Sequence, residues 1–467
     1  MTGDALLSRS TAQGRGALAA VTIGSGVALL DGTVVNIALP IIGHELGATF
    51  GELQWVVNGY MLTLAALVLM GGALGDRLGR RRVYLFGVAW FGVASLICAL
   101  AQSPTQLVAA RVLQGIGGAL LTPGGLALIN ASFRREDRAS AVGTWTGFSG
   151  VATAAGPFVG GWLLEHFGWR SIFAINVPLI ALVIGLAVRY VPESRDSSAG
   201  KFDWWGSALA VIGLGGTTFF LTGLGTAPVT TQVATGLVGG GALAGFVAVE
   251  ARTREPQMPL WLFRSRVFSS ANAMTFLVYG ALAVVMLLMV VQLQVSAGFS
   301  PLASGLAGLP ITIMMMLFSS RAARLGQRLG PRIPMTVGPL ICAAGTALLA
   351  TVTGATTYWA GVFPGVLVFA VGLTLLVSPL TAAVLAAAPD RMSGVASGVN
   401  NAVARGGSLL AVAALPALAG ITGSDYTDPA AFTDGYRTAL LICAGLLAAG
   451  CVVSWFGLGG ESRLDES

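Results

Sequence analysis

Long apolar runs of about twenty residues, separated by short polar breaks, are the feature that most constrains this chain. Crossing a hydrocarbon layer of about 30 Å takes about 20 helical residues, and backbone groups in lipid must be paired within a helix or a closed barrel. About fourteen runs meet that length, roughly at 16–42, 54–74, 83–101, 106–129, 139–164, 171–190, 205–222, 233–250, 269–292, 301–319, 335–352, 358–386, 394–420 and 437–458. We therefore expect an all-α polytopic membrane protein.

Composition supports this fold class and excludes others. Charged residues make up 10% of the 467 residues, whereas a soluble domain carries about 25%. The 65 glycines lie mostly inside apolar runs, as expected where helices pack closely in lipid. The net charge of +6 comes from arginines that form no long polybasic tract, so no nucleic-acid partner is expected.

Motifs of soluble catalysis are missing from the sequence. The sequence around Lys201, the one lysine, does not match the phosphate-binding G-x-x-x-x-G-K-[ST] pattern, and neither H-E-x-x-H nor G-x-S-x-G occurs. The four cysteines form no C-x-x-C pair. We therefore expect no enzyme activity, no metal and no cofactor.

The basic residues predict the orientation in the membrane. With fourteen spans both termini lie on one side, and placing them in the cytoplasm puts 22 of the 26 basic residues inside. The first apolar run is also too long for the core of a cleaved signal peptide. We expect a multi-pass protein of the cell (plasma) membrane with both termini cytoplasmic.

Two short patterns recur at nearly the same spacing. Gly75-Asp76-Arg77-Leu78-Gly79-Arg80-Arg81 returns as Gly326-Gln327-Arg328-Leu329-Gly330-Pro331-Arg332, and Asp137-Arg138-Ala139-Ser140 returns as Asp390-Arg391-Met392-Ser393. Such a repeat is typical of transporters built from two parallel halves. It predicts an amino-terminal six-helix bundle at 1–190, a two-helix insert with cytoplasmic connections at 191–268, and a carboxy-terminal six-helix bundle at 269–467.

The first copy of the repeated loop is the candidate conformational latch. Its glycines permit a tight turn between two spans, and Asp76 can accept hydrogen bonds from helix-end amides or pair with an arginine. The candidate latch residues are Gly75, Asp76, Arg77, Gly79, Arg80 and Arg81. The alternative is a basic loop that only fixes topology.

Asp31 is the only acidic residue that we place deep inside the membrane, at a depth of about 15 Å. Burial disfavours its charged form and a nearby cation favours it, so the carboxyl can exchange a proton as its surroundings change. Arg111, in the fourth span, is the natural partner by depth. The pair is the candidate for proton coupling, and the alternative is a fixed structural ion pair.

The fifth span carries a glycine-rich segment around a proline. Pro157 should kink this helix, while its glycines allow a neighbouring helix to approach closely. This candidate helix motif comprises Gly156, Pro157, Gly160 and Gly161. Tight packing alone is the alternative interpretation.

Taken together, these segments resemble the major facilitator superfamily, and within it the fourteen-span drug:proton antiporters. The Asp31 segment is similar to the family's first-span signature, the Gly72 to Arg82 loop to its cytoplasmic motif, Arg111 to Ala119 to its fourth-span basic motif, and Gly150 to Gly161 to its exporter motif. The resemblance implies a major facilitator fold of two six-helix bundles plus two inserted helices. It also implies protons as the coupling ion. Acidic residues found in the thirteenth span of some multidrug members are missing here, which weakens any claim of specificity for dicationic drugs.

These observations predict an antiporter that exports a hydrophobic or amphiphilic drug or antibiotic by alternating access, conferring resistance. Its expected partners are the lipid bilayer and the hydrophobic small molecule, and a monomer is favoured. Candidate residues of the substrate cavity are Asn36, Asn58, Tyr60, Gln114, Trp145, Phe148, Gln292, Gln294, Asn400, Asn401 and Arg405. Two alternatives stay open: an exporter of a lipid or lipid-like metabolite with the same fold, and a non-transporting membrane sensor or scaffold.

Overall fold

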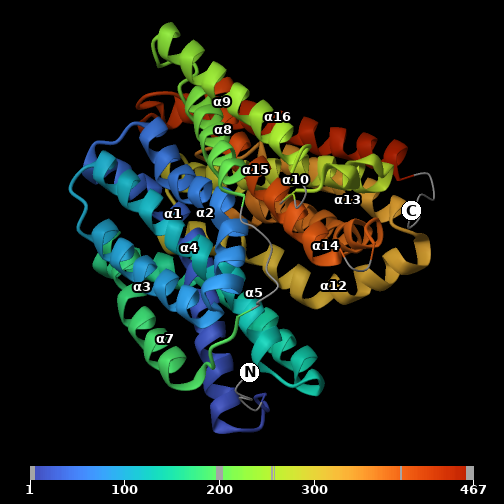
Figure 1. Cartoon of the computed structure of the whole chain (residues 1–467). Coiled ribbons are helices and arrows are strands. Elements are labelled where there is room, and N and C mark those ends of the chain that lie inside the picture. Colours follow the sequence, from blue (N-terminus) through green and yellow to red (C-terminus); the bar gives the residue numbers. More distant parts are fainter. Residues whose placement is uncertain (1–5, 196–202, 254–255, 257, 390–391, 459–467) are drawn as a thin grey trace. The chain divides into compact units, whose positions relative to one another are not determined.

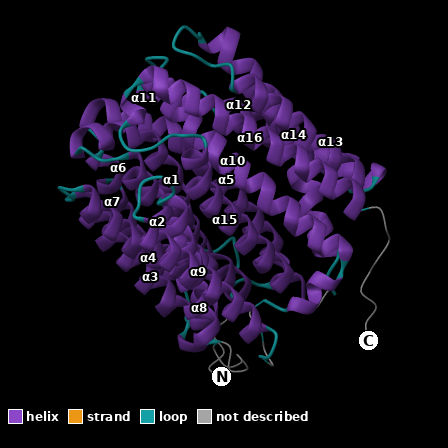
Figure 2. Cartoon of the chain, turned by 90° about the horizontal axis from the view of Figure 1, so that it is seen from above, coloured by secondary structure: helices purple, strands orange, loops and turns teal. Residues whose placement is uncertain are grey.

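The computed structural model describes residues 6–195, 203–253, 256, 258–389 and 392–458 of the chain. Within these ranges every named element is helical, and the extended segments contribute a single isolated bridge between Leu7 and Phe133. Figure 2 shows the helices joined by short loops. The expected all-α fold class is confirmed.

The chain divides into two compact units, which are described separately. Unit 1 comprises Met1–Ala48 and Trp55–Ser207, and unit 2 comprises Thr49–Gln54 and Ala208–Ser467. The helices of unit 1, coloured from blue to green in Figure 1, are α1 (Ala12–Leu46), most of α2 (Phe50–Leu78), α3 (Arg80–Ala99), α4 (Pro104–Ser132), α5 (Arg135–Phe167), α6 (Arg170–Ala174) and α7 (Asn176–Tyr190). The three-part division expected from the sequence stays a prediction.

Unit 2 contains α-helices together with short 3-10 and π turns. Its elements are most of α8 (Trp204–Thr222), α9 (Val229–Glu250), η1 (Leu260–Arg264), α10 (Arg266–Val295), α11 (Pro301–Leu306), α12 (Leu309–Leu329), α13 (Arg332–Leu349), η2 (Tyr358–Val362), α14 (Phe363–Ala386), α15 (Ser393–Leu418), η4 (Asp425–Thr427) and α16 (Pro429–Gly457).

Twelve helices of the described chain are long and apolar enough to cross a membrane, or thirteen if the two parts of the bent α2 form one span. The fifth expected span, 139–164, lies in α5, which has 33 residues but is not among them. Glycine, serine and threonine dilute the apolar residues of α5 and lower its hydropathy. The total of fourteen spans therefore stays a prediction.

Sequence-encoded caps fix where several helices begin and end. The Thr11 hydroxyl accepts the Gly14 amide at 3.0 Å at the start of α1, and Ser265 does the same for α10. The two repeated glycines of the tight loops have positive φ, 113° at Gly79 and 75° at Gly330, where a side chain would be strained. The recurring loops are thus turns of similar construction.

Helix pairing recurs in the two units as well. In unit 1, α1 packs on α5 and α7, and α3 packs on α4 and α7. In unit 2, α10 packs on α15 and α16, and α13 packs on α14 and α16. Glycines permit the closest approaches, because a Cβ atom at Gly117 of α4 would lie 2.7 Å from the Phe91 backbone nitrogen of α3. The internal sequence repeat thus corresponds to a repeated packing pattern.

The segment before α1 is held against the connection between α4 and α5 in unit 1. The Leu7 amide donates to the Ser132 carbonyl at 2.8 Å, and the Arg134 amide donates to the Leu7 carbonyl at 3.1 Å. The Arg9 amide donates to Asp137 Oδ2 at 3.0 Å. This hydrogen bond is the main cause that lowers the pKa of the Asp137 carboxyl below its ordinary value near 3.8.

The lowered pKa predicts a pH-dependent attachment of this segment. The carboxylate contact is fully present above the ordinary pKa and is lost as pH falls through the lowered one. Asp137→Asn should therefore increase hydrogen exchange of the backbone amides from Leu7 to Arg9 at neutral pH. Wild-type protein should lose the same protection only as pH falls below the ordinary pKa near 3.8 and through the lowered one. The exposed neighbour Glu136 provides the control variant, Glu136→Gln, and equal exchange in both variants would contradict this role of Asp137.

Candidate functional site

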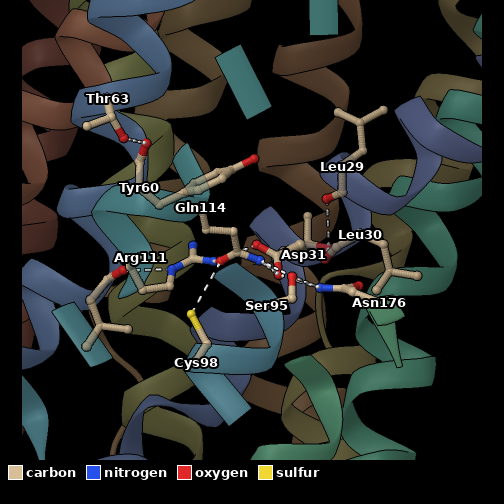
Figure 3. Close-up of polar contacts among 12 residues, drawn as sticks. Leu29, Leu30, Asp31, Tyr60, Thr63, Ser95, Cys98, Arg111, Gln114 and Asn176 are labelled. Carbon is tan, nitrogen blue, oxygen red and sulfur yellow. Dashed lines mark hydrogen bonds and ion pairs between the residues drawn. The ribbon is translucent and has the colours of Figure 1, made fainter. Parts of the chain in front are cut away.

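A buried ion pair lies inside unit 1, between α1 and α4. Arg111 Nη1 donates to Asp31 Oδ2 at 2.5 Å, and each residue is only 1% exposed. Figure 3 shows the two side chains pointing toward each other among the helix ribbons. The pairing that the sequence indicates is therefore present, while its role in proton coupling stays a prediction.

Three further polar side chains complete a network around the carboxylate. The amide nitrogen of Gln114 donates to Asp31 Oδ1 at 2.9 Å, and that of Asn176 donates to the same oxygen at 3.0 Å. The Ser95 hydroxyl accepts hydrogen bonds from both amides, at 2.8 and 3.2 Å. The two amide donors come from α4 and α7, and the hydroxyl comes from α3. Together with α1, which carries Asp31, these helices form the surroundings of the carboxylate.

The guanidinium is satisfied on its other sides. Arg111 Nε donates to the backbone carbonyl of Val56 at 3.0 Å, and Nη1 also donates to Gln114 Oε1 at 2.5 Å. The Tyr60 ring lies 4.3 Å from the guanidinium carbon, and the Phe173 ring lies 5.8 Å away. Cation–π contacts with desolvated rings stabilise a buried cation that water cannot reach.

Such a network surrounds the carboxylate with hydrogen-bond donors at a position where an unpaired charge is costly. Removing one member of a buried ion pair typically costs about 3–5 kcal/mol, because the other charge is left unpaired. A proton arriving at Asp31 would therefore change the interaction with Arg111. Loss of either charge would thus weaken the contact between α1 and α4 at this point.

Sequence reasoning missed two members of the network, Ser95 and Asn176. Both are fully buried, and both are polar residues inside otherwise apolar runs, which is the signal that could have identified them. Asn176 also has a buried oxygen, Oδ1, with no hydrogen-bond partner in the described structure. An unpaired buried acceptor typically costs about 1–3 kcal/mol.

The candidate latch loop has a partner that the sequence did not reveal. Asp76 Oδ1 accepts a hydrogen bond from Arg80 Nε at 2.8 Å. Pairing with an arginine is one of the two arrangements that the sequence predicts for Asp76. The backbone amides at the start of α3 donate to Glu193, whose carboxylate accepts from the Arg81 and Arg82 nitrogens at 3.1 and 3.2 Å. These helix-end amides are thus bound by Glu193, from the chain beyond α7, and Asp76 forms the arginine pair.

Other members of the latch set contribute locally. The Gly79 amide donates to the Gly75 carbonyl at 3.1 Å, which closes the turn, and the Arg81 side chain donates to the Val188 carbonyl at 2.6 Å. Arg77 lies in the last turn of α2. The loop is therefore attached to the end of α7 as well as to itself.

The fifth-helix motif lies against the first helix. Gly156, Gly160 and Gly161 are buried, and Pro157 is inside α5. A Cβ atom at Gly160 would lie 2.5 Å from Val34 Cγ1, and one at Gly156 would collide with Thr33. The motif therefore sets the spacing between α5 and the segment of α1 that carries Asp31.

The cavity candidates of unit 1 are in different surroundings. Tyr60 and Gln114 belong to the ion-pair network, while the Trp145 indole donates to the Ser25 hydroxyl at 2.9 Å. Phe148 is exposed and lines a groove of about 190 Å³ between α1, α5 and α7. Two asparagines have buried side-chain atoms without a hydrogen-bond partner in the described structure: Asn36, which is half-buried, and Asn58, which is fully buried.

In unit 2 the candidates mostly connect helices. Gln292 is fully buried and donates to the Val352 carbonyl at 3.1 Å, whereas Asn400 donates to Asn272 at 3.1 Å. Gln292 and Asn272 are twenty residues apart on α10, about 30 Å at 1.5 Å per residue, so these candidates do not converge. The remaining candidates are Gln294, which donates to Ser304, the exposed Asn401, which donates to the Ser397 carbonyl, and the half-buried Arg405.

The contact between α5 and α1 predicts a difference between two glycines of the same helix. Gly160→Ala should lower the thermal stability of the protein, because overpacking at Val34 costs about 1–3 kcal/mol. Gly147→Ala is the matched control, since a Cβ atom there has nothing within 4 Å. Thermal unfolding of the purified variants measures the effect. Equal melting temperatures for both would contradict the proposed contact.

Comparisons with known proteins agree on one family. The family model described as Major Facilitator Superfamily matches residues 21–412. The tetracenomycin C resistance and export protein of Streptomyces glaucescens is 36% identical over 418 residues, covering 86% of this chain and 75% of the relative. The multidrug resistance protein Stp of Mycobacterium tuberculosis is 35% identical over 404 residues, covering 85% and 74% respectively.

A solved structure supports the fold alone. The POT family transporter PepTSo aligns with a TM-score of 0.69 at 15% sequence identity, covering 95% of this chain and 97% of that one. The family model and the two relatives, in contrast, identify the family as well as the fold. The chain is thus a multi-pass membrane protein that belongs to the Major Facilitator Superfamily of transporters.

Proposed function

We propose that the protein is a proton-coupled efflux transporter that exports a hydrophobic or amphiphilic drug or antibiotic by alternating access. The observation that carries this proposal is the ion pair of Asp31 and Arg111, buried in a bundle of apolar helices. A carboxylate at membrane depth is costly, and it is retained where it serves ion or proton movement.

The coupling follows from the charge of the pair. Protonation of Asp31 from outside removes the negative charge that Arg111 neutralises, and this weakens the hold on cargo. Loss of the proton toward the cytoplasm restores the pair. The membrane potential contributes about 2.3 kcal/mol per elementary charge per 100 mV, so one proton supports a useful gradient of cargo.

The type of cargo follows from the relatives. The Streptomyces relative is named for resistance to and export of tetracenomycin C, and the mycobacterial one for multidrug resistance. We extend export of a drug or antibiotic to this chain. The latch around Asp76 and the contact of α5 with α1 are the elements that we expect to control switching between states.

Orientation is part of the proposal. The basic residues support a cytoplasmic location for both termini and for the connection around Arg252, with 22 of 26 basic residues then inside. We also propose that the protein is a monomer in the cell membrane, and that its partners are the lipid bilayer and the cargo.

The central test replaces the acid. Asp31→Asn cannot exchange a proton, so proteoliposomes should lose export of tetracenomycin C driven by a pH gradient while retaining downhill exchange. Because Arg111 would be left unpaired, the double variant Asp31→Asn with Arg111→Gln should have a higher melting temperature than the single variant and still fail to couple.

A second carboxylate provides the control for this test. Glu45, which accepts from the Trp169 indole at 2.8 Å, lies partly exposed and outside the network. Glu45→Gln should keep proton-driven export. Wild-type export by Asp31→Asn, or loss of coupling by Glu45→Gln alone, would refute the assignment of Asp31.

Orientation is tested by labelling single cysteines in intact cells with an impermeant maleimide, after the native cysteines have been replaced. Ser10→Cys and Arg252→Cys are exposed sites that should stay unlabelled from outside. Thr427→Cys, exposed in the connection between α15 and α16, should react. The opposite pattern would reverse the topology.

A further inference from the structure

Asn176 presents the two ends of its side-chain amide to different surroundings. Its nitrogen donates to Asp31 Oδ1 at 3.0 Å and to the Ser95 hydroxyl at 3.2 Å, as Figure 3 shows. Its oxygen is fully buried and has no hydrogen-bond partner in the described structure. One end of the amide is thus paired twice, while the other is unpaired.

The charge of Asp31 explains this orientation. An ionised carboxylate only accepts hydrogen bonds, so the amide nitrogen must face it. A protonated carboxyl carries an O–H group that needs an acceptor instead. A rotation of the terminal amide by about 180° would bring the unpaired oxygen to the position of the nitrogen, and such terminal torsions are broad and roughly two-fold.

We propose that Asn176 is a positioning residue that reads the protonation state of Asp31 by turning its side-chain amide. With Asp31 ionised, the nitrogen donates to the carboxylate. With Asp31 protonated, the amide oxygen accepts the carboxyl hydrogen, and the Ser95 hydroxyl donates to the same oxygen. This inference rests on the proposed proton-coupling role of Asp31.

The step balances without any further reactant. A proton from water forms an O–H bond on Asp31 Oδ1, and its charge cancels that of the carboxylate. Arg111 keeps its own proton and its bond to the Val56 carbonyl, but loses its anionic partner. The released proton returns to water when the amide turns back.

Few other groups near the carboxylate can titrate or carry charge. Arg111 and Gln114 face it from α4, Cys98 of α3 lies 3.8 Å from Gln114 Oε1, and Tyr60 of α2 stacks on Arg111. On α5, Gly156 and Gly160 lie against Thr33 and Val34 of α1, and on α7 Asn176 contacts Asp31; none of these three side chains titrates. Gln114 cannot take the place of Asn176, because its oxygen already accepts from Arg111.

The test uses infrared difference spectra of the full chain in nanodiscs, recorded between neutral and acidic pH with isotope-labelled asparagine. In wild-type protein, the carboxyl band of Asp31 should rise together with a shift of one asparagine C=O band from unbonded to bonded. Both signals should vanish in Asp31→Asn. In Asn176→Val, the asparagine shift should vanish and the carboxyl band should move to the frequency of an unbonded acid.

Asn176→Thr is the rescue variant, because its hydroxyl can donate to a carboxylate or accept from a carboxyl. Threonine has nearly the same volume as the valine of Asn176→Val, so the two variants differ mainly in hydrogen bonding. Asn176→Thr should restore the bonded carboxyl band. In proteoliposomes, Asn176→Val should lower kcat of proton-driven export about tenfold with KM nearly unchanged, while Asn176→Thr should stay within about threefold of wild type. Thr346→Val, a buried polar substitution on α13, is the control and should leave the pH profile unchanged.

The outcomes separate this inference from the proposed function. An asparagine shift in a protein that exports no tested compound would support the amide switch and refute the efflux proposal. Proton-driven export with no asparagine shift on acidification would overturn the amide switch and leave the efflux proposal standing. A carboxyl band that Asn176→Val does not move would likewise overturn it.

Discussion

The ion pair between Asp31 and Arg111 imposes demands on the rest of unit 1. Two charges removed from water are stable only if their geometry is good and their remaining donors and acceptors are satisfied. Here the carboxylate accepts from three side chains, and the guanidinium also contacts a backbone carbonyl and two rings. Those partners come from α2, α4, α6 and α7, so the pair depends on how these helices pack with α1.

Small residues make that packing possible. Gly117 brings α4 into backbone contact with α3, and Gly160 brings α5 against the valine that lies three residues after Asp31. In lipid, close van der Waals packing takes the place of the hydrophobic effect between helices. The high glycine content therefore belongs to the same physical arrangement as the charged site, because polar partners on different helices meet only when the backbones approach closely.

A transporter also needs part of this arrangement to change. Asp31 offers a proton-binding group, and the unpaired oxygen of Asn176 offers a second hydrogen-bonded state that the same packing can accommodate. At the end of the bundle, Asp76 is paired within its own loop, and Glu193 ties the start of α3 to the chain after α7. The two sites involve charges of different exposure: the pair of Asp31 and Arg111 is buried, whereas Asp76 and Glu193 are partly exposed.

Much of this protein can be predicted from its sequence, because lipid permits few folds and tolerates few charges. The apolar runs predicted the all-α class, Asp31 stood out as the single acid placed deep inside the membrane, and the matched depth of Arg111 identified its partner. The recurring Gly-x-Arg-Leu-Gly pattern predicted a repeated turn, which the positive φ values of Gly79 and Gly330 confirm. Only the tertiary structure placed Ser95, Asn176 and Glu193, because their partners are from 19 to 145 residues away in the chain. Whether such side chains meet depends on the rotation and depth of each helix, and packing decides both.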